Sequence, residues 1–196
     1  MPTAPLTARS ERTRTALRNA AMVRFLAQGV EATTAEEIAS DAGVTLRTFY
    51  RHFSSKHDLL FADYDSGLHW FRRALAERPA DESVIESVSV AVFAFPYDVD
   101  AVVQIANLRV GTLDPSRIVQ HMRRVQSDFA HELLDHLRER HPDADELGIT
   151  VAARAIAAAV FAGMEVWLQR GSRSLPELAQ LFRDSLSAVG PAFRHY

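Results

Sequence analysis

The sequence predicts an all-α protein: an N-terminal three-helix module of the helix-turn-helix type, joined by a fourth helix to a larger C-terminal helical domain, about nine helices in all. Three observations predict this class. Apolar residues recur every three or four positions almost throughout, no segment alternates with a period of two for long, and turn signals are far apart. The 196 residues, 47% of them hydrophobic, can bury a sizeable core.

Capping signals mark the first four helices. We expect them at about residues 10–28, 34–42, 45–53 and 55–78. Thr34 and Glu37 form a capping box, in which each side chain serves a backbone N–H of the other. The hydroxyl of Thr45 can reach the N–H of Thr48. Ser55 is followed three residues later by Asp58, which predicts another helix start there.

Five longer helices should follow, at about residues 81–95, 99–113, 115–141, 147–170 and 174–189. Pro96 ends the first of these, and Pro115 is a favoured first helical residue after the Asp114 cap. Ser174 with Glu177 predicts one more capping box. Because short helices give way to long ones near residue 54, we expect two domains, 1–54 and 55–196.

The segment GVTLRTFYRHF, residues 43–53, carries the most specific pattern. Gly43 can adopt the left-handed conformation that turns the chain between two short helices, which is the helix-turn-helix arrangement. On the second of these helices Phe49 and Phe53 lie four residues apart and should anchor it on the first two helices. The opposite face then presents Thr45, Arg47, Thr48, Arg51 and His52.

This polar face has the chemistry of a DNA-reading surface. Arg47 and Arg51 project together, and a guanidinium matches the O6 and N7 acceptors of guanine in the major groove. Lys56, at the start of the next helix, is suited to a phosphate. A solvated surface helix could carry the same arginine pair. The predicted DNA-binding residues are Thr34, Thr45, Leu46, Arg47, Thr48, Tyr50, Arg51, His52 and Lys56.

The charge distribution agrees with this assignment without deciding it. The net charge is −3, but residues 1–30 contain five arginines against a single acidic residue, Glu11. Such asymmetry between segments is typical of chains that bind nucleic acid with one part. A general preference for arginine would give the same excess.

The stretch TTAEEIASDAGVTLRTFYRHFSSKHDLL, residues 33–60, closely resembles the DNA-binding module of the TetR/AcrR family of bacterial transcriptional regulators. The resemblance extends from about Arg9 to Leu60, and beyond it only the long helices and the total length are similar. It rests on Phe25, Gly29, Thr33, Thr34, Ile38, Ala39, Ala42, Gly43, Val44, Thr48, Tyr50, His52, Phe53 and Lys56.

The resemblance implies a homodimer that binds a palindromic operator, usually as a repressor, and a small ligand in the C-terminal helices that releases the DNA. Two departures concern the operator. Many members have Gly or Pro at the position of Arg47 and a small residue at that of Leu46, and Glu36 lies where the family often meets phosphate. The operator sequence is therefore not carried over. A DNA-binding regulator without an effector, or a ligand-binding protein with a vestigial helix-turn-helix, are the alternatives.

Aromatic side chains in the C-terminal part could line an apolar cavity, with a few amides to orient the ligand. The predicted ligand-binding residues are Trp70, Phe71, Phe93, Gln104, Asn107, Gln126, Phe129, Phe161 and Trp167. Since Arg109 is the one charge expected deep among these helices, a hydrophobic effector is favoured. Plain core packing of the aromatic residues is the alternative, and the three amides could equally lie at the surface.

Helices 152–167 and 178–189 are the best candidates for a dimer interface. The first combines small and apolar residues, among them Ala159 and Gly163, on nearly all sides, and small residues permit close helix approach. A charged side chain at either position should then abolish both the dimer and DNA binding. The alternative is a buried helix of the monomer core.

Other classes find little support. There is no cysteine. Residues that could bind a metal, His131, Glu132 and His136, lie on one predicted helix, but a solvated helix face has the same composition. We therefore expect no metal, cofactor or catalytic site. The N-terminus lacks a secretory signal. The apolar run 155–164 is about half of what a bilayer needs, so we expect a cytoplasmic protein without membrane partners.

Overall fold

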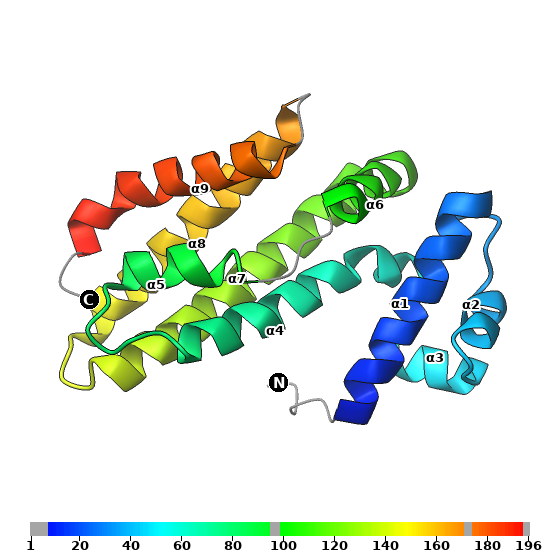
Figure 1. Ribbon diagram of the computed structural model, residues 1–196, viewed down its shortest axis with the longest axis horizontal. Helices are drawn as coiled ribbons and strands as arrows, with labels where there is room; N and C mark the ends of the chain where they lie inside the picture. The colour runs from blue at the N-terminus through cyan, green and yellow to red at the C-terminus, as the bar shows by residue number, and fades with distance from the viewer. Residues whose placement is uncertain (1–7, 95–98, 171–173, 194–196) are drawn as a thin grey trace. The chain divides into compact units, whose positions relative to one another are not determined.

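The computed structural model describes residues 8–94, 99–170 and 174–193, and all its regular elements in these ranges are helical (Figure 1). The nine predicted helices are confirmed within the described residues as α-helices, and two short 3-10 segments accompany them. They are α1 (Ala8–Gln28), α2 (Ala35–Asp41), α3 (Leu46–His52), η1 (Lys56–Phe61), α4 (Ala62–Ala76), α5 (Val84–Ala91), α6 (Val99–Thr112), α7 (Pro115–Arg140), α8 (Glu146–Gln169), α9 (Leu175–Val189) and η2 (Gly190–Phe193).

The predicted capping residues begin the helices where the sequence placed them. Thr34 Oγ1 accepts the N–H of Glu37 at 3.2 Å, and the N–H of Thr34 donates to the Glu37 carboxylate at 2.8 Å. Thr45 Oγ1 accepts the N–H of Thr48 at 3.2 Å. Ser174 Oγ accepts the N–H of Glu177 at 3.3 Å, which is one of the two hydrogen bonds of the predicted capping box. Asp145, which was not predicted as a cap, begins α8 by accepting the N–H of Gly148 at 2.8 Å. Local hydrogen bonds of this kind depend only on near neighbours in sequence, and for that reason they are readable from it.

Two helix starts differ from the prediction. The segment after Ser55 is a 3-10 helix through Phe61, in which Asp58 N–H reaches the Ser55 carbonyl at 3.2 Å, and α4 begins only at Ala62. Helix α5 begins at Val84 rather than Asp81, because Ser83 and Glu86 form a capping box that the sequence reading missed. The helix ends at Ala91, earlier than the predicted end at Phe95, since residues 92–94 are not helical; Phe95 and Pro96 themselves lie outside the described residues.

The chain divides into two compact units, and each unit is made of two segments that are separated in the sequence. Unit 1 holds the residues up to 63 together with 104–118, and unit 2 holds residues 64–103 and those from 119 onward. In unit 1 the buried Arg109 donates from Nε to the Leu60 carbonyl at 2.5 Å and lies over the Phe61 ring. Arg117 pairs with Asp58 at 2.8 Å. Residues 104–118 are thus fastened to η1. The division at residue 54 remains a proposal about function.

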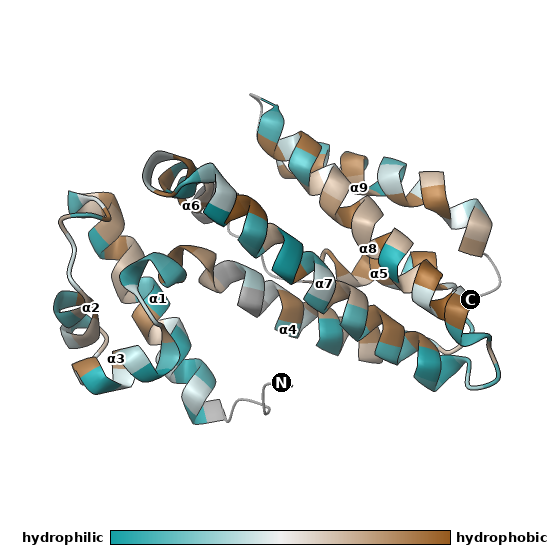
Figure 2. Ribbon diagram, turned by 180° about the vertical axis from the view of Figure 1, so that it is seen from behind, coloured by the Kyte–Doolittle hydropathy of each residue, from teal (hydrophilic) through white to brown (hydrophobic). Residues whose placement is uncertain are grey.

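Unit 2 is built around α7 and α8. Phe71 of α4 stacks on Phe129 of α7 at 3.9 Å, and Phe129 meets Phe161 of α8 edge-on at 5.8 Å. Trp167 is buried and donates from Nε1 to the Ser174 carbonyl at 3.0 Å, which ties the end of α8 to the start of α9. Much of the α8 ribbon is coloured hydrophobic in Figure 2.

Helix α8 is also the described helix that is long and apolar enough to cross a bilayer by length and composition alone. The prediction from the run 155–164 was wrong about apolar length, because the helix extends well beyond that run at both ends. Ten of its residues are nevertheless buried within unit 2, which is the pattern of a helix in a protein core.

A half-buried histidine should make unit 2 sensitive to acid. Burial, followed by the charges of Arg140 and His141, lowers the pKa of His136 to about 4, and its buried Nε2 has no hydrogen-bond partner among the residues that the structure describes. Because the unfolded chain binds the proton first, stability is complete above about pH 6.5 and is lost as pH falls from there towards 4. His136→Phe should flatten this part of the pH profile of urea unfolding. Parallel profiles for the two proteins would contradict this assignment.

Candidate nucleic-acid interface

Helices α1, α2 and α3 form the helix-turn-helix module (Figure 1), and Arg24 of α1 fixes α2 in place. Its guanidinium donates to Glu37 at 2.8 Å and to Asp41 at 2.6 Å, and these bonds lower the pKa of the Asp41 carboxyl. The turn to α3 follows at once. Gly43 has a φ of +65°, as predicted, a conformation that an L side chain rarely adopts.

Helix α3 is anchored by the two predicted phenylalanines. Phe49 and Phe53 are both buried, with ring centroids 6.1 Å apart. The guanidinium of Arg14, from α1, lies 4.8 Å from the Phe53 ring centroid and donates to the His52 carbonyl at 3.4 Å. The orientation of the seven-residue helix is therefore set by burial on one side, which leaves its opposite face to solvent.

That exposed face contains two arginines. Arg47 and Arg51 are exposed, and neither guanidinium makes a hydrogen bond or ion pair within the described residues. Tyr50 is 54% exposed and packs edge-on against Phe49. The hydroxyls of Thr45 and Thr48 lie 3.0 Å apart beside the first turn of α3. These side chains were predicted from the sequence to lie close together, and in the structure they lie on or beside one short helix. Leu46, also predicted, is half-buried there.

Three predicted residues have contacts within the module instead. Thr34 caps α2. The Nε2 of His52 is buried and has no hydrogen-bond partner among the described residues. Burial lowers the pKa of the ring most, and the positive charges of Arg51 and Arg14 lower it further. Lys56 Nζ donates to the carbonyls of Glu31 and Thr33 at 2.9 and 3.0 Å. The prediction for Lys56 rested on its place at a helix start, and sequence reasoning missed these carbonyl contacts because they join residues more than 20 positions apart.

The predicted ligand-binding residues lie in different surroundings. Gln104 and Asn107 are exposed residues of unit 1. In unit 2, Phe71, Phe129, Phe161 and Trp167 are buried against one another or against neighbouring backbone, whereas Trp70 and Phe93 are 37% and 38% exposed. Gln126 lines a groove between α7 and α8. The buried aromatic residues fill the core of unit 2, as in the packing alternative, and an apolar cavity among them stays a prediction.

Residues 17–62, which include α2, α3 and most of α1, match the family of bacterial regulatory proteins, tetR family. The chain is also 35% identical over 121 residues to the HTH-type transcriptional regulator TcmR of Streptomyces glaucescens. The helix-turn-helix module of this chain is therefore of the TetR type. The match to TcmR covers 58% of this chain and 54% of TcmR, so the chain spans about half the length of that relative.

Further comparisons extend this TetR-family similarity along the chain. The HTH-type transcriptional regulator SrpR of Pseudomonas putida is 29% identical over 193 residues, which cover 95% of this chain and 88% of SrpR. The solved structure of SmeT, the repressor of the Stenotrophomonas maltophilia multidrug efflux pump SmeDEF, has a TM-score of 0.54 at 22% identity, covering 94% of this chain and 92% of SmeT. This chain therefore shares an all-α fold with SmeT over most of its length, and residues 17–62 contain its TetR-type helix-turn-helix.

Proposed function

We propose that this regulator is a cytoplasmic repressor that binds a palindromic operator as a homodimer and is released from it by a small molecule. The exposed face of α3 carries the DNA-binding part of the proposal. It presents two guanidinium groups that have no partners among the described residues, on a helix whose other face is fixed by Phe49 and Phe53. Two such cations on one face of a helix suit a polyanion such as DNA.

In the proposed complex α3 enters the major groove. Arg47 and Arg51 are placed for bidentate contacts to guanine O6 and N7, while Thr45, Thr48 and Tyr50 contact the phosphate backbone and set the register. Lys56 Nζ donates to two backbone carbonyls and also pairs with the Glu31 carboxylate at 3.8 Å, so a phosphate would have to compete with that carboxylate for Lys56. Thr34, Leu46 and His52 remain at the margins of the proposed interface.

Arg47→Ala should weaken operator binding by about 1–3 kcal/mol and relax the preference at one base pair, because a base-reading guanidinium is lost. Fluorescence anisotropy with DNA from upstream of the gene, scanned by single-base changes, measures both effects. Arg124→Ala, which removes an exposed arginine of α7, is the control for the change in net charge. Unchanged selectivity in Arg47→Ala would show that this residue does not read a base.

The dimer is proposed to form through the outer α8 face, defined here as the exposed residues Leu147, Val151, Ala158, Ala162 and Val166, together with the neighbouring outer side of α9. Leu147 is 70% and Val151 48% exposed, and the spacing of the five residues places them along one side of the helix. Such an apolar stripe fits a self-complementary two-fold contact. Two α3 helices would then need to lie about 34–36 Å apart or wider to meet successive major grooves.

Release by a ligand is proposed to act through residues 104–118 as well as through α4. Helices α6 and α7 both continue from unit 1 into unit 2, and within unit 1 they hold η1 by the Arg109–Leu60 and Arg117–Asp58 contacts. A ligand that favours a shifted α6 would therefore move the segment that precedes α4. Typical coupling between two such sites is about 1–3 kcal/mol.

The effector part of the proposal has a direct test. SmeT, which shares this fold, has been solved as a complex with triclosan. A screen by thermal shift should find small molecules that stabilise this chain, and those molecules should also release its operator. If every stabilising molecule leaves the affinity for DNA unchanged, the chain is instead a DNA-binding regulator without an effector.

A further inference from the structure

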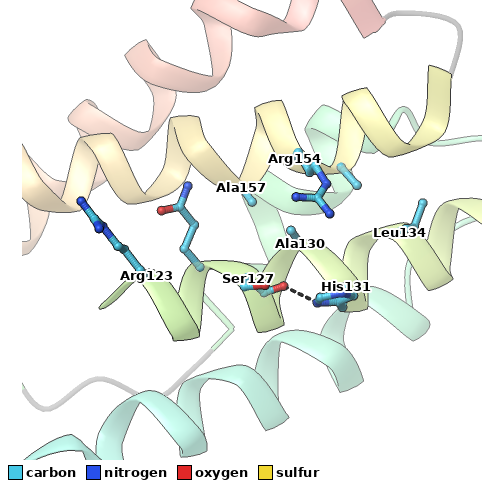
Figure 3. Close-up of a pocket in the computed structure, with 9 residues that line it drawn as sticks. Arg123, Ser127, Ala130, His131, Leu134, Arg154 and Ala157 are labelled. Atoms are coloured by element: carbon cyan, nitrogen blue, oxygen red, sulfur yellow. Dashed lines mark hydrogen bonds between the residues drawn. The ribbon is translucent and has the colours of Figure 1, made fainter. Parts of the chain in front are cut away.

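A groove on unit 2 between α7 and α8 has a lining unlike the aromatic core beside it. Its volume is about 260 Å³. Ala130 and Leu134 of α7 and Ala153 and Ala157 of α8 supply an apolar surface. The polar part of the lining is Arg123, Gln126, Ser127, His131 and Arg154 (Figure 3). The groove therefore joins a small apolar surface to a set of hydrogen-bond donors, and no carboxylate is among the residues that line it.

The two arginines of this groove differ from the others in unit 2. Among the described residues of that unit, every other arginine has an ion pair or hydrogen bond, such as Arg72 with Glu132 and Arg170 with Glu177. Arg123 and Arg154 have none. Figure 3 shows Arg123 reaching from α7 towards α8 and Arg154 reaching from α8 towards α7. Two cations that are unpaired among the described residues are thus brought to one groove by the consecutive helices α7 and α8.

Charge and shape together define what the groove can hold. A guanidinium forms two parallel hydrogen bonds with a carboxylate or another planar oxyanion, and such charge-assisted bonds are stronger than neutral ones. The Gln126 amide can add a neutral hydrogen bond. The alanines and Leu134 are suited to a short apolar group, and the volume, just below the range of ordinary ligand sites, restricts the groove to a small molecule.

We propose that the α7–α8 groove binds a small organic anion, a carboxylate that carries a short aliphatic or aromatic group. The carboxylate pairs with Arg123 and Arg154, and the apolar group lies on Ala130, Leu134, Ala153 and Ala157. This site differs from the aromatic cavity expected from the sequence, and of the residues predicted there it contains only Gln126. The proposal concerns binding and holds whether or not the ligand releases DNA.

Isothermal titration calorimetry of the full chain with octanoate tests the site. Octan-1-ol, which has the apolar chain without the charge, and sulfate, which has the charge without the chain, are the control ligands. Octanoate should bind more tightly than either. Arg123→Gln and Arg154→Gln should each weaken octanoate binding at least about tenfold, the loss expected for one charge-assisted hydrogen bond. Arg124→Gln, which removes the same charge one residue further along α7, should leave binding unchanged. Operator affinity is measured separately, so failure here is distinct from failure of the proposed repressor.

Four results would overturn the proposal. These are the absence of octanoate binding at millimolar concentration, equal binding of octan-1-ol, equal binding of sulfate, and equal weakening by Arg124→Gln. A fifth concerns assembly, because Arg154 borders the outer α8 face. If the double variant Arg123→Gln with Arg154→Gln sediments as a monomer while the unmodified chain is a dimer, the arginines hold a partner subunit rather than a ligand. If the double variant stays folded and assembled but does not bind octanoate, the site is supported.

Discussion

Gly163→Asp is expected to unfold the C-terminal unit. A Cβ atom at Gly163 would lie 2.9 Å from Phe182 Cδ1 and 3.3 Å from the Leu181 carbonyl oxygen, so α8 and α9 would have to move apart. Overpacking of this kind costs about 1–3 kcal/mol, and an unpaired buried carboxylate adds several kcal/mol more. The sum is comparable with the whole stability of a typical domain, about 5–15 kcal/mol.

Circular dichroism with urea unfolding measures this effect, and Ala162→Asp is the matched control. Ala162 is the preceding residue of the same helix, but it is exposed, so its substitution should leave the folded protomer intact. The result also separates two explanations of the small residues in α8. From the sequence, a charge at Ala159 or Gly163 was expected to break a dimer. Both residues are buried within the protomer, so any loss of dimer there would follow from loss of the fold. A stable Gly163→Asp protein would contradict this packing.

The double variant Ala158→Asp with Ala162→Asp should separate the proposed dimer without unfolding its protomers. In a two-fold interface the same patch meets itself, so each new carboxylate is doubled and would have to be desolvated close to like charges. Operator affinity should fall by at least about 100-fold, because one recognition helix alone loses the gain from binding two half-sites together.

Sedimentation and operator titration together check this second expectation. Val119→Asp places the same charge on an exposed apolar position of α7, away from α8 and α9, and should leave both the mass and the affinity unchanged. A double α8 variant that still sediments as a dimer would place the interface elsewhere. A monomer that binds the operator as tightly as before would instead remove the need for a dimer in DNA recognition.

Features set by near neighbours were predictable from the sequence. The capping box of Thr34 and Glu37, the positive φ at Gly43 and the buried Phe49 all follow from residue types at short spacing. The helix start after Ser55 was predicted, but its 3-10 form was not. The cap at Ser83 was missed because several nearby polar residues could have begun that helix.

Features that depend on distant residues were beyond such reasoning. Aromatic residues that line a cavity and aromatic residues that fill a core have the same sequence pattern, and only the stacking of Phe71, Phe129 and Phe161 indicates core packing. The unpaired state of Arg123 and Arg154 could not be predicted either, since it depends on which acids lie near them in space. The grouping of the proposed DNA-reading residues of α3 could be predicted from the sequence, because they occupy a single short helix.

The attachment of residues 104–118 to η1 limits how this module can be transplanted. An exchange of specificity between regulators that moves residues 1–63 alone would leave behind Arg109 and Arg117, and with them the groups that bind the Leu60 carbonyl and Asp58. The buried Ile105, Ala106 and Leu113 would stay behind as well. A functional chimera should therefore carry two separate pieces of this chain, and variation in operator preference among relatives is expected to be accompanied by compensating changes on α6.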